Sequence, residues 1–194
     1  PDAIESILEM VENNTETLKS ECSRFFYCFE KGHEVTEDDV EKILAHNKEE
    51  SAFTLFEAMA DSSSSPSQRL DSSLSILQKL MLSKNSVGVE LIAGLAYCFR
   101  QLRTWHNLHA NGAFPSDADL RSNGFYNKTS QTRYRKAANV WGPGSVASII
   151  SLLSSTDMSM RETGKAFEET SLSMMIYSIV MKNGAYCTEY YIED

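Results

Sequence analysis

Glycine and proline are scarce in this chain of 194 residues, which contains 9 glycines and 4 prolines. An all-β or an α/β protein would use more of both residues to build its turns. Apolar residues make up 42% of the chain, which is enough for a buried core. The composition therefore predicts an all-α fold.

Cysteine is also sparse, and its spacing is not that of a metal or redox site. The four cysteines, Cys22, Cys28, Cys98 and Cys187, form no CxxC pair and stand at no metal-ligand spacing. Cys22 and Cys98 fall on apolar faces of predicted helices. We expect buried, reduced thiols rather than disulfides.

The sequence lacks the segments that would export or anchor it. Its start has no charged region followed by an apolar one, and no apolar run approaches about 18 residues. We therefore expect a cytoplasmic protein with no membrane segment. The first residue is Pro1 rather than methionine, and a helical pattern begins at once. This start suggests a piece of a longer polypeptide.

No motif of catalysis or phosphate binding is present. A Walker loop is missing, and the glycines of 142–145 have neither its lysine nor a preceding apolar strand, so they are expected to end one helix and begin the next. His106 and His109 have a metal-compatible spacing but no third ligand. Glu168 and Glu169 are expected on a solvated helix face. We predict no catalytic site, no cofactor and no metal.

The net charge of −9 comes from one part of the chain. Residues 1–50 hold 14 acidic and 5 basic residues, whereas residues 51–194 hold 13 of each. Within the neutral part, Arg100–Lys136 contains seven basic residues and two acidic ones. The sequence thus combines an acidic first segment with a locally basic one.

Apolar residues recur at helical spacing along most of the chain. We expect three short helices before about residue 46, the last of them capped by Thr36, and a charged joint at His46–Glu50. Further helices are predicted over Ala52–Met59, from Pro66 with Ser65 as cap, and over Val87–Leu108, Thr132–Trp141, Val146–Leu153, Thr156–Thr163 and Phe167–Lys182. The tail Ala185–Asp194 is strand-like in composition and has no predicted role.

Basic and aromatic residues lie together late in the neutral part. Trp141 follows three basic residues, Arg133, Arg135 and Lys136, and Tyr134 lies between the two arginines. Cations bind phosphates and flat rings stack on bases, so this segment is a candidate for contact with a nucleic-acid single strand. The alternative is that Tyr134 and Trp141 anchor the core and the cations form a solvated face.

The order of several segments resembles the bacterial DNA polymerase III delta subunit family, the clamp loader component that opens the sliding clamp. The segments are TLKSECSRFFYCF, VTEDDVEKIL, ESAFTLFEAMAD and LSILQKLMLSKNSVGVELIAGLAYCFRQLRTW, in this order. The family's motifs correspond to Phe53–Ala58, Leu74–Leu82 and Phe99–Leu102. Further on, YRKAANVW resembles a basic helix of the family.

Two positions depart from the family's pattern while keeping its charge. Glu57 stands where aspartate is common, and Arg161 stands where lysine is usual, four residues after Asp157. These replacements leave the resemblance in place but weaken a claim of equivalent detail.

The resemblance implies an all-α fragment with a small three-helix lid-like domain, residues 1–47, and a larger helical collar-like domain, residues 48–194. The family's AAA+-like domain, which binds the sliding clamp, would precede Pro1. The collar would join the other loader subunits, delta prime and tau/gamma, as a non-catalytic assembly part.

Within the collar, the candidate contacts with primer-template DNA are Arg133, Arg135, Lys136 and Trp141. Two other functions stay open from the sequence. One is a stand-alone helical interaction or regulatory domain that binds a peptide or small ligand between helices. The other is an all-α enzyme, which would require the histidines, carboxylates and thiols to converge in space.

Overall fold

The chain is all-α in the computed structural model, which describes residues 3–4, 7, 15–36, 39–40, 50–83, 87–112, 114–126 and 128–185. No strand occurs within these ranges. The tail beyond Ala185, the joint before Glu50 and Cys187 lie outside them. The helices are α2 (Thr15–Cys28), α4 (Ala52–Met59), α5 (Pro66–Ser83), α6 (Gly88–Leu108), α7 (Asp117–Ser122), α8 (Lys128–Val140), α9 (Pro143–Thr163) and α10 (Glu168–Lys182), with 3-10 turns η1 (Ala110–Gly112) and η2 (Lys165–Phe167).

The chain divides into two compact units. The first contains Pro1–Glu49 together with Asp117–Gln131, and the second contains Glu50–Ser116 together with Thr132–Asp194. The sequence did not suggest that residues 117–131 would be grouped with the first segment, because their turn-rich pattern resembles a connection within the larger part.

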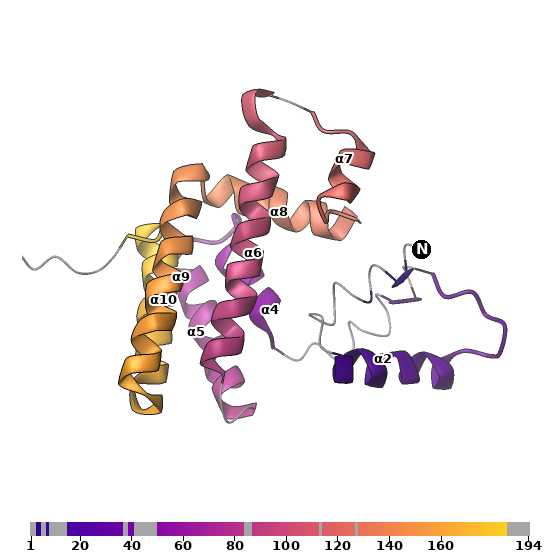
Figure 1. Ribbon diagram of the computed structural model, residues 1–194, viewed down its shortest axis with the longest axis horizontal. Coiled ribbons are helices and arrows are strands. Elements are labelled where there is room, and N and C mark those ends of the chain that lie inside the picture. The colour runs from indigo at the N-terminus through magenta and orange to yellow at the C-terminus, as the bar shows by residue number, and fades with distance from the viewer. Residues whose placement is uncertain are drawn as a thin grey trace, which may run out of the picture. The chain divides into compact units, whose positions relative to one another are not determined.

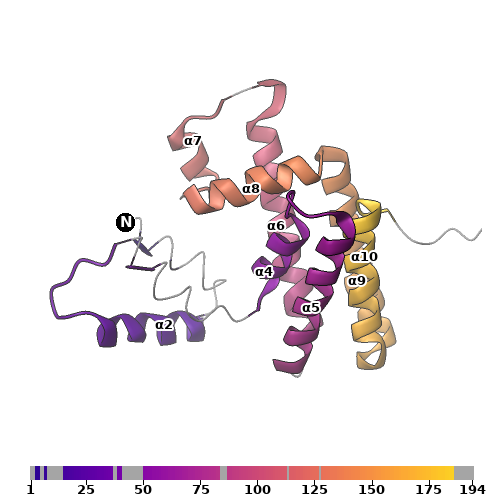
Figure 2. The same ribbon diagram turned by 180° about the vertical axis from the view of Figure 1, so that it is seen from behind.

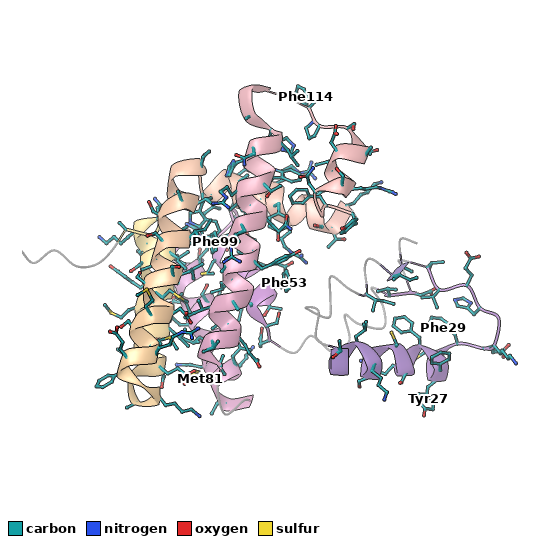
Figure 3. The ribbon with its side chains drawn as sticks, in the orientation of Figure 1. Tyr27, Phe29, Phe53, Met81, Phe99 and Phe114 are labelled. Atoms are coloured by element: carbon teal, nitrogen blue, oxygen red, sulfur yellow. The ribbon has the colours of Figure 1, made fainter. Side chains whose placement is uncertain are left out.

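The first unit contains a small apolar cluster. Phe25 of α2 and Val40 are buried, and Phe29 packs against them. Figure 3 shows Phe29 and Tyr27 on opposite sides of α2, and Tyr27 is 90% exposed. At Thr36, the predicted cap, the hydroxyl accepts from the N–H of Asp39 (3.3 Å) and the N–H donates to the Asp39 carboxylate (3.0 Å). Most of the helix predicted to follow Thr36 lies outside the described residues.

The second unit is built around the helices α5, α6, α9 and α10. Helix α9 packs on α6, α10 packs on both α5 and α9, and the short α4 contacts α5 and α6 (Figure 1). The start of α5 agrees with its prediction, because the Ser65 hydroxyl accepts from the Gln68 N–H and Pro66 is the first helical residue. These helices position the residues of the candidate site.

Helices α4 and α6 approach closely because small residues meet where they cross. A Cβ atom added to Gly94 would lie 2.4 Å from the Cβ of Ala52. Even alanine at position 94 would therefore force the two helices to shift. This crossing places the aromatic residues of α4 directly against α6.

Glu168 caps a helix that lies far away in sequence. Its carboxylate accepts hydrogen bonds from the N–H groups of Val87 (3.2 Å) and Gly88 at the start of α6. The residue is buried, so the prediction of a solvated face was wrong for Glu168, while Glu169 is exposed. Gly88 permits this contact, because a Cβ there would lie 2.7 Å from the carboxylate oxygen.

Two other predictions need correction. Helix α9 runs without interruption from Pro143 to Thr163, so no separate segment begins at Thr156. Cys98 is buried as expected, but Cys28 is exposed. None of the described cysteines, Cys22, Cys28 and Cys98, forms a disulfide.

Replacing Glu168 by alanine should lower the free energy of unfolding by roughly 1–3 kcal/mol, because two buried N–H groups lose a charged acceptor. Glu168→Gln keeps an oxygen acceptor and should lose less. The matched control Glu169→Ala should cost under about 1 kcal/mol, since this exposed residue only favours the helix dipole. Urea unfolding followed by circular dichroism measures all three. If Glu168→Ala and Glu169→Ala lowered the free energy of unfolding equally, the capping role of Glu168 would be contradicted.

Candidate nucleic-acid interface

Trp141 lies inside an aromatic cluster contributed by three helices. Its ring centroid is 6.0 Å from that of Phe56 on α4 and 5.1 Å from that of Phe99 on α6. Phe56 also lies 5.2 Å from Phe99 and 5.8 Å from Tyr134 on α8. Figure 3 shows Phe99 within the helix group. The cluster joins α4, α6 and the end of α8.

The position of Trp141 corrects its predicted role. The side chain is 0% exposed, so no ring face is open to a nucleic-acid base. We therefore remove Trp141 from the predicted DNA contacts. The alternative interpretation, that Tyr134 and Trp141 are core anchors, accounts for both residues, since Tyr134 is also buried.

Arg133 is held by residues of α4. Its Nε donates to the Glu57 carboxylate at 2.8 Å, and its guanidinium carbon lies 5.3 Å from the centre of the Phe53 ring. The side chain of Arg133 is only 13% exposed. An ion pair combined with stacking on an aromatic ring fixes the guanidinium in one place. Arg133 thus contributes to the attachment of α8 to α4.

Arg135 and Lys136 are exposed on α8 and remain the candidate phosphate contacts. Arg135 donates to the Thr132 hydroxyl at 3.2 Å. The pKa of Asp61 is lowered to about 2, mainly by hydrogen bonds from the hydroxyls of Ser63 and Ser64 and from the Ser63 N–H. The positive charge of Lys136 makes a smaller contribution to this lowering. Asp61 therefore stays ionised at neutral pH beside this cation.

His106 of α6 and His109, which directly follows the helix, both contact backbone carbonyls. His106 Nε2 lies 2.8 Å from the carbonyl oxygen of Trp141, and His109 Nδ1 lies 2.9 Å from that of Trp105. The His109 ring stacks on the Trp105 ring at 4.3 Å. Across the part of the chain that the structure describes, no group of three or more His, Cys, Asp or Glu side chains could hold a metal ion.

Sequence reasoning missed an aromatic platform next to Arg133. The ring centroids of Tyr97 on α6 and Phe53 on α4 lie 6.0 Å apart in a T-shaped arrangement, and the Phe53 ring also contacts the Arg133 guanidinium. Tyr97 is 42% exposed, and the exposed Arg100 follows it by three residues on α6. Only the helical spacing of Tyr97 and Arg100 could have indicated that an aromatic ring and a cation share one exposed face.

Comparisons of the chain with protein-family models, with curated proteins and with solved structures find no match. Among the described helices, none is both long enough and apolar enough to cross a bilayer. The residues themselves must therefore carry the functional argument.

Replacing Trp141 by alanine should lower the free energy of unfolding by roughly 3–5 kcal/mol, because it leaves a large cavity among the aromatic rings. Trp141→Phe should cost much less, since it keeps an aromatic ring and removes an indole N–H that is buried without a hydrogen-bond partner in the described structure. Denaturant titration of both variants measures the difference.

The control for this experiment is Phe114→Ala, because Phe114 is 97% exposed and its loss should change stability by less than about 0.5 kcal/mol. The core role of Trp141 would be refuted if Trp141→Ala kept its stability and lost only affinity for single-stranded DNA.

Proposed function

We propose that the chain is the C-terminal, non-catalytic assembly part of a DNA polymerase III delta subunit, within the clamp loader that opens and loads the sliding clamp in DNA replication. The observation that carries this proposal is the order of the resembling segments along the chain. The resemblance covers nearly the whole chain, although it is a pattern of order and spacing rather than a catalytic signature.

The packing of these segments supports the proposal. Phe53–Ala58 lies in α4, Leu74–Leu82 in α5 and Phe99–Leu102 in α6, and α4 packs on both other helices. The three segments that resemble the family are separate in sequence, and the helices that contain them pack together. A family-wide spacing pattern is expected for segments that must fit against one another.

The partners follow from the same proposal. The second unit packs against the delta prime and tau/gamma subunits in the cytoplasm, and an AAA+-like domain before Pro1 contacts the sliding clamp. Each contact of this kind buries on the order of 1,600 Å² and is anchored by a few large side chains. Because the neighbours differ, the faces that meet them must differ too.

The DNA contact within this proposal is reduced to two residues. Arg135 and Lys136 are exposed on α8, whereas Arg133 is paired with Glu57. Both exposed cations suit phosphate binding, which depends on charge and needs no stacking ring. In the assembled loader they contact the backbone of the primer-template DNA.

The proposal predicts that this chain forms a stoichiometric complex when it is mixed with delta prime and tau/gamma of the same organism. Size-exclusion chromatography with light scattering measures the mass of the complex. A matched negative control is the chain with Trp141→Ala, if the stability measurement shows that its second unit unfolds. Absence of a complex at concentrations near about 10 μM would refute the proposal, because specific assemblies of this interface size hold together in that range.

The DNA contact is tested separately with Arg135→Ala and Lys136→Ala. Each change should weaken the binding of the assembled loader to primer-template DNA and reduce the slope of log affinity against log salt by about 1, because one phosphate contact is lost. The matched control is Lys182→Ala, which changes an exposed residue of α10 and should leave the slope unchanged. Equal slopes for all three variants would remove α8 from the DNA-binding surface.

A further inference from the structure

The basic segment of the sequence begins on α6 with two arginines that the DNA contact proposed above does not use. Arg100 and Arg103 are both exposed. The ion pairs formed between described residues include neither guanidinium. An exposed guanidinium with no carboxylate beside it is suited to binding a phosphate group.

The charge of this part of α6 is positive over a long stretch. No residue between Glu90 and Asp117 is acidic. Glu90 is exposed on α6, but it lies two helical turns before Tyr97, while Arg100 and Arg103 lie after Tyr97. The second half of α6 therefore presents cations to the solvent without acidic residues among them.

An exposed aromatic ring precedes the two arginines on the same side of α6. Tyr97 is 42% exposed and lies three residues before Arg100, which in turn lies three residues before Arg103. Large side chains on a helix lean toward its N-terminus, and the residues one turn before Tyr97 are the small Ala93 and Gly94. On that side, α6 itself has no large side chain to cover the ring.

The Tyr97 ring is held by neighbouring side chains. Its centroid lies 6.0 Å from that of Phe53, which projects from α4 where this helix packs on α6 (Figures 2 and 3). The side-chain amide of Gln101 donates to the Tyr97 hydroxyl at 3.4 Å. A ring that is already positioned loses little conformational freedom when a ligand stacks on it.

The cation and the carboxylate on the far side of Phe53 neutralise each other. The Arg133 guanidinium lies 5.3 Å from the centre of the Phe53 ring, and its Nε donates to Glu57 at 2.8 Å. This ion pair leaves the two arginines of α6 as the cations that act beside Tyr97.

We propose that Tyr97, Arg100 and Arg103, which we call the Tyr97–Arg103 face, bind single-stranded nucleic acid. A base stacks on the Tyr97 ring, and neighbouring phosphates of the strand contact the guanidinium groups of Arg100 and Arg103. A ring for a base and cations for phosphates are the two elements of strand binding that does not depend on sequence.

The combination of ring and cations favours a single strand over two other occupants. In a duplex the bases are already paired and stacked, so its phosphates would use the arginines while the ring would add nothing. An acidic peptide would likewise need only the cations. The inference stands on these side chains and does not require the clamp loader proposal, in which the strand would be the unpaired part of the template.

The ring is tested with the chain alone and a fluorescently labelled oligothymidylate of about 20 nucleotides, by anisotropy at about 50 mM salt. Tyr97→Leu should weaken binding roughly 5-fold or more, because a stacked base loses its ring, whereas Tyr97→Phe should bind like the unchanged chain. The matched control is Tyr177→Leu on α10, where the tyrosine is 38% exposed, and it should have no effect.

The cations are tested through the salt dependence of the same binding. Arg100→Gln and Arg103→Gln should each reduce the slope of log affinity against log salt by about 0.7, the value for one phosphate contact of a single strand. The matched control is Arg161→Gln, which changes an exposed arginine of α9 and should leave the slope unchanged. Circular dichroism and thermal unfolding verify that each variant is folded.

Three further probes separate the possible ligands. A duplex of the same length should bind equally well to the unchanged chain and to Tyr97→Leu, because its bases are not open to stacking. Oligouridylate of the same length distinguishes an RNA strand from a DNA strand, and dependence on Tyr97 with either one supports the proposal. Polyglutamate that binds through Arg100 without any dependence on Tyr97 would assign the face to an acidic peptide instead.

The proposal would be overturned by no binding of either strand at about 100 μM chain, since even non-specific contacts are detected in this range at low salt. It would also be overturned if Tyr97→Leu bound the strand like Tyr177→Leu, or lost as much affinity for the duplex as for the strand. All of these measurements use the chain without loader subunits, so their failure is distinct from a failure to assemble with delta prime and tau/gamma.

Discussion

The contact of Trp141 with Phe56 and Phe99 is the constraint on which the second unit depends. It fixes α4, α6 and the end of α8 to one another, and His106 holds the carbonyl of Trp141 from α6. Because Gly142 and Pro143 follow at once, the buried indole also fixes where α9 begins. From this start, the direction of α9 is set by its packing on α6 and α10.

Most of the helices could be predicted from the sequence because their signals are local. Pro66 after a capping serine and the apolar spacing of Val87–Leu108 predicted two helices close to their observed bounds. The predicted break at Thr156 failed for an equally local reason. The hydroxyl of Thr156 donates to the carbonyl of Leu152 at 2.9 Å, so the helix itself satisfies the polar group that was expected to interrupt it.

The candidate site was harder to predict, because its residue composition is compatible with two different arrangements of the side chains. A tryptophan near several cations suits both a strand-binding surface and a buried anchor, and only burial distinguishes them. Glu168 had no local signal at all, since the N–H groups that it caps lie about 80 residues earlier. The pairing of Arg133 with Glu57 is likewise a contact between distant segments.

Because Cys98 is buried, the rate at which its thiol reacts can be used to follow the opening of the fold. Its thiol is inaccessible on α6, while that of Cys28 is exposed, so a thiol reagent in solution should modify Cys28 at once and Cys98 only when the helices separate. The rate at Cys98 therefore measures how often α6 is released from its neighbours, without any change to the sequence. The thiol of Cys28 thus reports the reactivity of the surface, and the thiol of Cys98 reports how often the helices around α6 separate.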